Sequence, residues 1–104
     1  MKLAEKQERM KEKLNDELLF HILGLVEVEL CKATENYDTF HNYHEGYAVL
    51  KEEVDELWDA IKLKQIDTER NSKVKKEAIQ VCAMAIRILH DCCKFSKSKD
   101  GEYL

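Results

Sequence analysis

Apolar residues recur at helical spacing in three long segments of the chain. Between residues 17 and 33 they occur every three or four positions, which predicts an amphipathic helix. From about His44 to Leu63 the pattern is sharper and predicts a second helix. The core stripe expected for this second helix consists of Tyr47, Leu50, Val54, Leu57 and Ile61.

The third segment predicts the central helix of the fold. It is expected to start at Asn71 or Ser72, either of which can cap it, and to run to about Phe95. Between Ala78 and Leu89 this segment is apolar on most of its circumference. A helix of that kind is expected to be buried by its neighbours, so we place it at the centre of the fold.

Polar residues mark the ends of the first two predicted helices. Asn15 or Asp16 can cap the first helix. Asn42 can cap the second, with Glu45 reaching back to it as in a capping box. Gly24 interrupts the first helix at a cost of about 1 kcal/mol relative to alanine, which indicates a close contact with another helix.

Charge separates the two ends of the chain from its middle. Residues 1–15 alternate basic and acidic side chains and are predicted to form a charged N-terminal helical arm or extension. Residues 16–95 are expected to form the helical domain, and residues 96–104 a flexible tail.

The composition favours an all-α fold. The chain has 104 residues, no proline and only three glycines, which suits one helical domain better than a turn-rich β fold. We therefore predict an antiparallel bundle of three main helices. Because a monomer of this size buries only a modest core, we expect the bundle to be completed in a homodimer or homotetramer.

Charge and cysteine content restrict the partners. A net charge of −4 argues against binding of polymeric nucleic acid, but it leaves room for a mononucleotide that carries magnesium. The four cysteines have no zinc-finger or C-x-x-C spacing, which indicates reduced thiols in a cytoplasmic protein. No apolar segment approaches the ~20 residues of a membrane span, and no signal peptide is visible.

Acidic residues of the second predicted helix gather beside its core stripe. Helical projection puts Glu53 and Glu56 on one face with Val49 and Ala60, whereas Glu52 lies further towards solvent. Carboxylates three or four positions apart repel one another unless a cation lies between them. Glu53 and Glu56 are therefore candidate metal ligands.

The third predicted helix carries a polar line on one narrow sector. Spacings of three, seven and four residues put its members on the same face: Glu77, Gln80, Arg87 and Asp91. Polar groups on an otherwise apolar helix should be paired or should bind something. One interpretation is a salt bridge between Arg87 and Asp91. The other is that the line binds a ligand.

The two acidic sets are expected to meet. Residues 64–70 form a short connection, so the helices on either side should pack antiparallel. Counted from that connection, Glu53 and Glu56 lie about 12 to 17 Å along their helix, and Glu77 and Gln80 lie about 9 to 14 Å along theirs. Converging carboxylates need a metal, and oxygen-only ligands favour magnesium, with manganese second, over zinc. The alternative is a set of surface acids with one buried salt bridge.

The order and spacing of these residues resemble those of a known family. Glu53-x-x-Glu56, a spacer of twenty residues, and Glu77-x-x-Gln80 resemble the E-x-x-E and E-x-x-D motifs of the MazG-like all-α nucleoside triphosphate pyrophosphohydrolases. That family usually has another glutamate just before the first motif, as Glu52 is here.

The resemblance covers roughly residues 18–95, and the stretches 44–58 and 77–87 look most like the small, phage-type members. It implies a helical bundle completed by dimerisation or higher assembly. It also implies magnesium-dependent hydrolysis of a nucleoside triphosphate between its α and β phosphates, which gives nucleoside monophosphate and pyrophosphate.

By the same resemblance, Glu53, Glu56 and Glu77 would be metal ligands, and Glu52 would be a ligand or would orient the attacking water. Glu52 and Glu53 are thus the catalytic candidates, and Arg87, or a lysine such as Lys73 or Lys76, would meet the substrate phosphates. Gln80 departs from the family's aspartate, because its amide oxygen can bind magnesium but brings no charge and cannot act as a base. The alternative function is therefore a catalytically weak or inactive nucleotide-binding or interaction protein of the same fold.

Several residues near the acidic helix are further candidates. His41 and His44, at its entrance, are predicted to cap the helix or to contact the edge of the substrate, since a zinc site needs more ligands than lie nearby. Phe40 and Tyr43 are candidates for the wall of a base pocket. Trp58 is predicted to lie in the core or an interface, with stacking on a base as the lesser interpretation.

Overall fold

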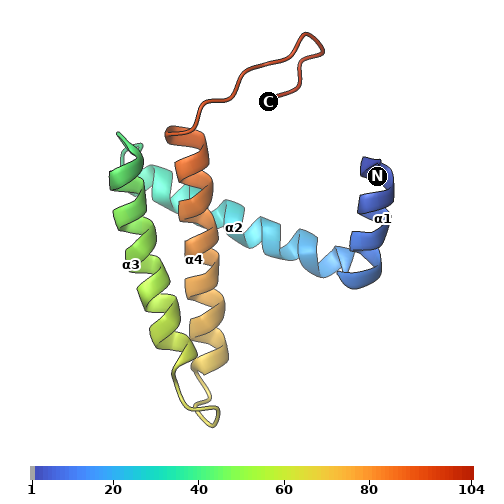
Figure 1. Cartoon of the computed structure of the whole chain (residues 1–104). Coiled ribbons are helices and arrows are strands. Elements are labelled where there is room, and N and C mark those ends of the chain that lie inside the picture. Colours follow the sequence, from blue (N-terminus) through green and yellow to red (C-terminus); the bar gives the residue numbers. More distant parts are fainter. Residues whose placement is uncertain (1) are drawn as a thin grey trace.

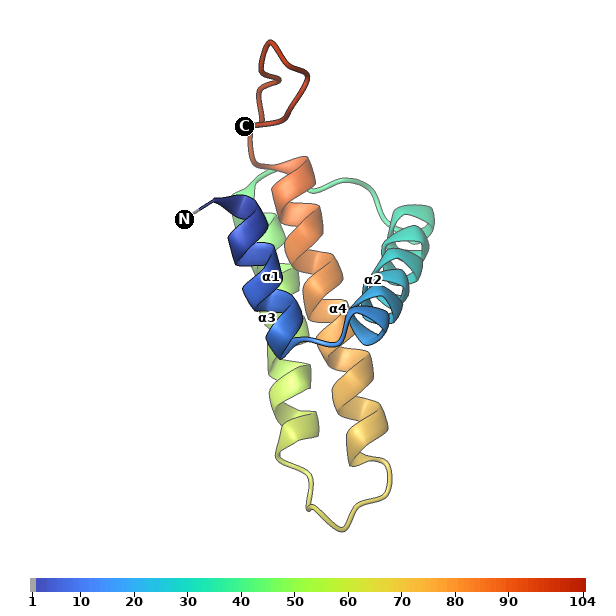
Figure 2. The ribbon, with the colours of Figure 1, turned by 90° about the vertical axis from the view of Figure 1, so that its right-hand side faces the viewer.

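The computed structural model describes residues 2–104, and this part of the chain is all-α, as predicted. Two helices form an antiparallel hairpin, and a third packs against one of its members (Figures 1 and 2). The bounds of the helices in the described residues are α1 Leu3–Lys13, α2 Asp16–Asn36, α3 Tyr43–Ile61 and α4 Arg70–Asp91. The hairpin consists of α3 and α4, and α4 lies between α3 and α2, which confirms its central position.

Asparagine side chains start two of the helices. Asn15 caps α2 by accepting a hydrogen bond of 2.9 Å from the Leu18 N–H. Asn42 caps α3 by accepting one of 2.9 Å from the Glu45 N–H. The expected reciprocal half of the capping box is wrong, because the Glu45 carboxylate pairs instead with His41 Nδ1 at 2.9 Å.

The bounds of α4 differ from the prediction at both ends. The helix starts at Arg70 rather than behind a cap at Asn71 or Ser72. The Arg70 guanidinium donates hydrogen bonds of 3.0 and 3.1 Å to the carbonyl oxygen of Ile61, which ties the start of α4 to the end of α3. The helix ends at Asp91, four residues before the predicted end.

Beyond α4 the chain forms a small exposed hairpin. The backbones of Ser96 and Leu104 exchange hydrogen bonds of 3.2 and 2.7 Å, and Lys97 and Tyr103 form a single antiparallel bridge. Gly101 makes the turn at a φ of 85°, a left-handed conformation that glycine adopts at no steric cost.

The core lies where α2 crosses α4 beside the first half of α3 (Figure 2). Its buried members are contributed by α2, by the α2–α3 connection and by α4: Val26, Ala33, Phe40, Ala83 and Met84. The first half of α2 extends past this crossing, and every residue of α1 is exposed.

The face of α3 that packs on α4 differs from the predicted core stripe. Gly46 and Ala60 are the buried residues of α3, and Glu53 lies half-buried between them. Gly46 and Ala60 allow a close approach of the helix axes at these two points, and Val49 and Leu50 pack against the core between them. The prediction is wrong for three members of the stripe, which are exposed: Tyr47, Val54 and Ile61.

Gly46 marks a close approach of α3 to α4. A Cβ atom at this position would lie 2.7 Å from Ile88 Cγ1 and 3.3 Å from Phe40 Cδ2. Gly46→Ala should therefore lower the free energy of unfolding by roughly 1–3 kcal/mol, because overpacking outweighs the gain in helix propensity. Urea unfolding measures the change.

Gly24→Ala is the matched control for that substitution. A Cβ atom at Gly24 meets nothing within 4 Å, so the close helix contact predicted there is wrong. This variant should gain up to about 1 kcal/mol of stability. Equal effects of the two substitutions would show that Gly46 is not sterically confined.

Large apolar side chains stay exposed on an elongated body. The principal extents are 53 × 39 × 22 Å. On the first half of α2, Phe20 is 81% exposed, and on α3 Tyr47 and Trp58 are 61% and 57% exposed. Trp58 is therefore not a core residue of the single chain. Among residues 2–104, none of the helices combines the length and apolarity that a membrane crossing requires.

Candidate metal centre

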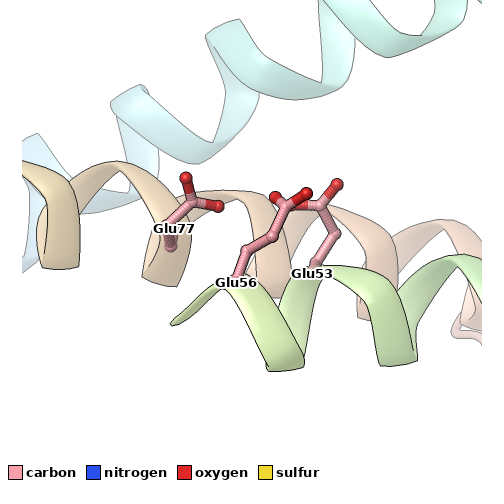
Figure 3. A group of neighbouring side chains, drawn as sticks. All are labelled: Glu53, Glu56 and Glu77. Carbon is pink, nitrogen blue, oxygen red and sulfur yellow. The ribbon is translucent and has the colours of Figure 1, made fainter. Parts of the chain in front are cut away.

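Three glutamates from two helices converge halfway along the hairpin (Figure 3). Glu53 and Glu56 extend from α3 and Glu77 extends from α4, and one carboxylate oxygen of each lies within 4.8 Å of the others. Their carboxylates point to the side along which α2 passes. The antiparallel hairpin thus brings the two acidic sets to one height, as the residue count predicted. Such a cluster can hold a metal ion, because one cation can gather three carboxylate oxygens at this separation.

Gln80 completes this group from α4, one turn after Glu77. With its amide nitrogen turned towards the carboxylates, it donates hydrogen bonds of 2.9 Å to Glu77 Oε2 and 2.8 Å to Glu53 Oε2. These bonds relieve part of the repulsion between the two acids. With the amide turned over, its oxygen faces the same point, so the four side chains fit a hard cation that prefers oxygen ligands.

Without a cation, the Glu53 and Glu77 carboxylates of the cluster bind protons more strongly than free side chains do. Burial first, and then the charges of Glu56 and Glu77, together raise the pKa of Glu53 to about 7. Burial also raises the pKa of Glu77, as do its hydrogen bond and charge interaction with Glu56. A cation that binds here would displace protons, because it would stabilise the ionised carboxylates.

Glu29 of α2 is a fourth carboxylate near the cluster. It was not predicted as a site residue from the sequence. The charge of Glu29 contributes to the raised pKa values of both Glu53 and Glu77. A signal for it exists in the pattern, because Glu29 follows Val26 by three residues and precedes Ala33 by four, and both of these are buried. A carboxylate at a core-facing helix position is unusual unless it is paired.

A cavity of about 640 Å³ adjoins the carboxylates. Glu52, Glu53 and Gln80 form part of its wall. Two basic side chains also line the cavity, Lys32 from α2 and Arg87 from α4. The cavity therefore reaches the carboxylate cluster at Glu53 and is lined by two cationic side chains as well.

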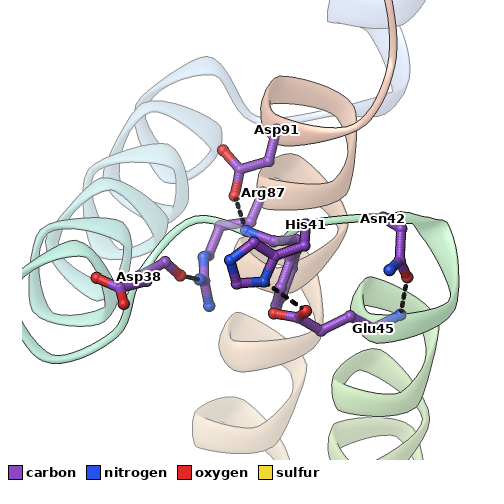
Figure 4. A network of polar contacts seen from close by, with 7 residues as sticks. Asp38, His41, Asn42, Glu45, Arg87 and Asp91 are labelled. Carbon is purple, nitrogen blue, oxygen red and sulfur yellow. Dashed lines mark hydrogen bonds and ion pairs between the residues drawn. The ribbon is translucent and has the colours of Figure 1, made fainter.

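Arg87 holds the connection between α2 and α3 (Figure 4). Its side chain donates a 2.7 Å hydrogen bond to the Asp38 carbonyl oxygen and lies over the Phe40 ring, 4.1 Å from the ring centre. The expected Arg87–Asp91 salt bridge is not formed within residues 2–104. Asp91 instead accepts a 2.9 Å bond from the Phe40 N–H and pairs with His90 at 2.9 Å.

The Asp91 carboxylate has a hydrogen-bond partner at each of its oxygens, the Phe40 N–H and His90. Burial alone would raise its pKa, but the hydrogen bonds from His90 and the Phe40 N–H outweigh burial and hold the pKa below its ordinary value. Arg87 and Asp91 thus fix two neighbouring points of the α2–α3 connection, whose residues form one wall of the cavity.

Most of the other residues that were predicted to contact the substrate lie outside the cavity wall of the single chain. Lys73 pairs with Glu69 at 3.3 Å, and Lys62 lies 5.8 Å from the Trp58 ring centre. His41, rather than His44, lines the cavity, and its hydrogen bond to Glu45 raises the pKa of the imidazole. Four residues predicted to touch substrate are not part of the cavity wall, so their roles stay predictions: His44, Trp58, Lys73 and Lys76.

In comparisons with known proteins, no family model, no curated protein and no solved structure matches the chain. The described residues form four helices, and α3 and α4 carry an acidic cluster that can hold a metal ion.

Proposed function

We propose that the protein is a magnesium-dependent nucleoside triphosphate pyrophosphohydrolase. The main support is that Glu53, Glu56 and Glu77 bring carboxylate oxygens within 4.8 Å of one another, next to a cavity of about 640 Å³. The resemblance of their order and spacing to the MazG-like motifs supports the substrate class. Nucleoside triphosphate would be hydrolysed to nucleoside monophosphate and pyrophosphate.

The ligand set consists of oxygen donors alone. Glu53, Glu56 and Glu77 would hold the ion, with the amide oxygen of Gln80 as the fourth protein ligand. When bound, magnesium, or manganese in its place, would neutralise phosphate charge and lower the pKa of a coordinated water. Gln80 fits this role only after its amide turns over, since its nitrogen otherwise bonds to the carboxylates.

Glu52 would orient the attacking water. It lies on the cavity wall next to Glu53 and is exposed, so water can reach it. The water oxygen would bond to one of the two phosphorus atoms of the α,β bridge as the bond from that phosphorus to the bridging oxygen breaks. The bridging oxygen and the electron pair of the broken bond would leave with the other phosphate product. The water proton would pass to Glu52 or to solvent.

A second copy of the chain is the proposed protein partner. The exposed apolar residues of α3 lie on a face that the hairpin itself does not cover: Tyr47, Val54, Trp58 and Ile61. A homodimer or homotetramer would remove this surface from water. In that arrangement Trp58 is an interface residue, and stacking on a base is its lesser role.

One observation favours a second candidate function, a nucleotide-binding protein with weak or no catalysis. The Gln80 amide satisfies Glu53 and Glu77 without any cation, and it brings no negative charge of its own. Both effects lower the affinity of the cluster for magnesium.

Pyrophosphate release from a panel of canonical and modified nucleoside triphosphates, with magnesium present, tests the proposed function. We expect one pyrophosphate per monophosphate on at least one substrate. Glu53→Gln should reduce the rate by at least about 100-fold, because the ligand loses its charge. Glu17→Gln, an exposed acid at the start of α2, is the matched control and should keep the rate.

The outcomes separate the two functions. Absence of release on every substrate, together with unchanged magnesium binding in Glu53→Gln, rejects the enzyme and the metal site. Magnesium and nucleotide binding without turnover selects the binding protein.

A further inference from the structure

Arg87 is a buried cation whose partners are all neutral. Its side chain is 6% exposed. It donates to the Asp38 carbonyl at 2.7 Å and to the Met84 sulfur at 3.5 Å, and it lies over the Phe40 ring. Within residues 2–104, it forms no ion pair with a carboxylate. Neutral partners recover only part of the hydration that a buried guanidinium loses, and a guanidinium has five N–H groups, so donors remain for an anion.

Arg87 faces open space on two sides. It lines the cavity next to the carboxylates and also a neighbouring one of about 420 Å³. It follows Gln80 by seven residues, or two turns, so it lies about 10 Å further along the same face of α4. Helical side chains lean towards the N-terminus of their helix, and the Met84 contact shows that Arg87 does so. The guanidinium is thus directed back towards Gln80 and the cluster.

Lys32 brings a second cation to the same cavity from α2. It is the lysine of the lining residues, and it is exposed. In the part of the chain that the structure describes, its ammonium forms no ion pair, whereas Lys73 is paired with Glu69. The other ionised groups of this wall are mostly carboxylates, which repel an anion. The positive charge that a phosphate meets in this cavity therefore comes from Lys32 and Arg87.

From this arrangement we propose that Arg87 and Lys32 form an anion subsite that receives the β and γ phosphates of the substrate. The inference rests on the proposed function and adds the direction in which the substrate lies. The α,β bridge would lie at the carboxylate cluster, and the pyrophosphate that leaves would lie along α4 towards Arg87. The nucleoside would then lie on the other side of the cluster.

Calorimetric titration with inorganic pyrophosphate, a nucleoside triphosphate and the matching monophosphate, each with magnesium, tests the subsite. Lys32→Met should weaken binding of pyrophosphate and triphosphate about tenfold, since one charge-assisted contact is lost, and should leave the monophosphate unchanged. Lys75→Met, an exposed lysine of α4 outside the cavity wall, is the matched control and should change none of the three.

Arg87→Lys should weaken pyrophosphate binding as well, because a lysine cannot reproduce the fork of donors. Since Arg87 also holds the α2–α3 connection, its variant is compared only if its melting temperature stays close to that of the unaltered protein. Lys32 is exposed, so Lys32→Met is not expected to disturb the fold, and its pyrophosphate affinity alone tests the subsite.

Pyrophosphate binding is measured without turnover, so the two proposals fail separately. Lys32-dependent pyrophosphate binding in a protein that hydrolyses nothing would keep the subsite and reject the enzyme. Hydrolysis with pyrophosphate affinity unchanged in Lys32→Met would keep the enzyme and reject the subsite. An equal loss of monophosphate affinity would reject the proposed direction of the substrate.

Discussion

The metal-free protein is expected to lose stability as the pH rises from about 5 to 8, and magnesium is expected to restore it. Glu53 has a pKa of about 7 in the fold, compared with 4.5 for a free side chain. Between these values the folded state keeps a proton that the unfolded state has released. The free energy of unfolding therefore falls as the pH rises. The stabilisation from this proton is complete below about pH 4.5 and is lost as the pH passes through 7.

The expected loss is roughly 1–2 kcal/mol, which allows for screening of the half-buried carboxylate by solvent. Urea unfolding at pH 5, 6, 7 and 8, with chelator and with saturating magnesium, measures it. Glu53→Gln should reduce the pH dependence because no proton titrates there, and Glu17→Gln should preserve it. The raised pKa of Glu77 leaves a smaller slope in the same direction. An undiminished slope in Glu53→Gln, or a protein at pH 8 that magnesium does not stabilise, would contradict the cluster as a cation site.

Gln80→Asp is expected to raise the affinity for magnesium by tenfold or more and to destabilise the metal-free protein. The aspartate adds a negative charge to the three glutamates, which favours a divalent cation. Without the cation it removes the donors to Glu53 and Glu77, and it adds a repulsive charge in their place. If the enzyme is proposed correctly, turnover at low magnesium concentration should rise as well.

Magnesium titration calorimetry and melting curves with chelator measure the two effects. Gln80→Leu serves as the contrast, since it loses the amide donors but gains no charge, and it should lose both stability and magnesium affinity. Gln65→Asp, in the exposed α3–α4 connection, controls for added charge alone. Unchanged magnesium affinity in Gln80→Asp would mean that this side chain does not reach the ion.

Much of this architecture could be predicted because it depends on local sequence. Apolar periodicity defined α2, α3 and α4, and the asparagine caps placed the first residues of α2 and α3 closely. The short α3–α4 connection forced an antiparallel hairpin, so counting residues was enough to bring Glu77 opposite Glu53 and Glu56.

Features that depend on how helices meet could not be predicted in this way. Large apolar residues dominated the expected stripe of α3, but Gly46 permits the closer contact, and α3 is turned so that Glu53 faces α4. The sequence left two partners open for Arg87, the Asp91 carboxylate and a substrate phosphate. Its hydrogen-bonded partner is a backbone carbonyl at Asp38, in a connection whose path no periodicity describes. Glu29 reaches the cluster only because α2 crosses α4 at that height.

The uncovered apolar face of α3 has a consequence for how stability is measured. If a second copy covers it, folding and association are one equilibrium, governed by mass action. The melting temperature then increases with protein concentration, and a dilute spectroscopic sample will melt below a concentrated calorimetric one. Variants of this chain are therefore comparable only at a single, stated protein concentration.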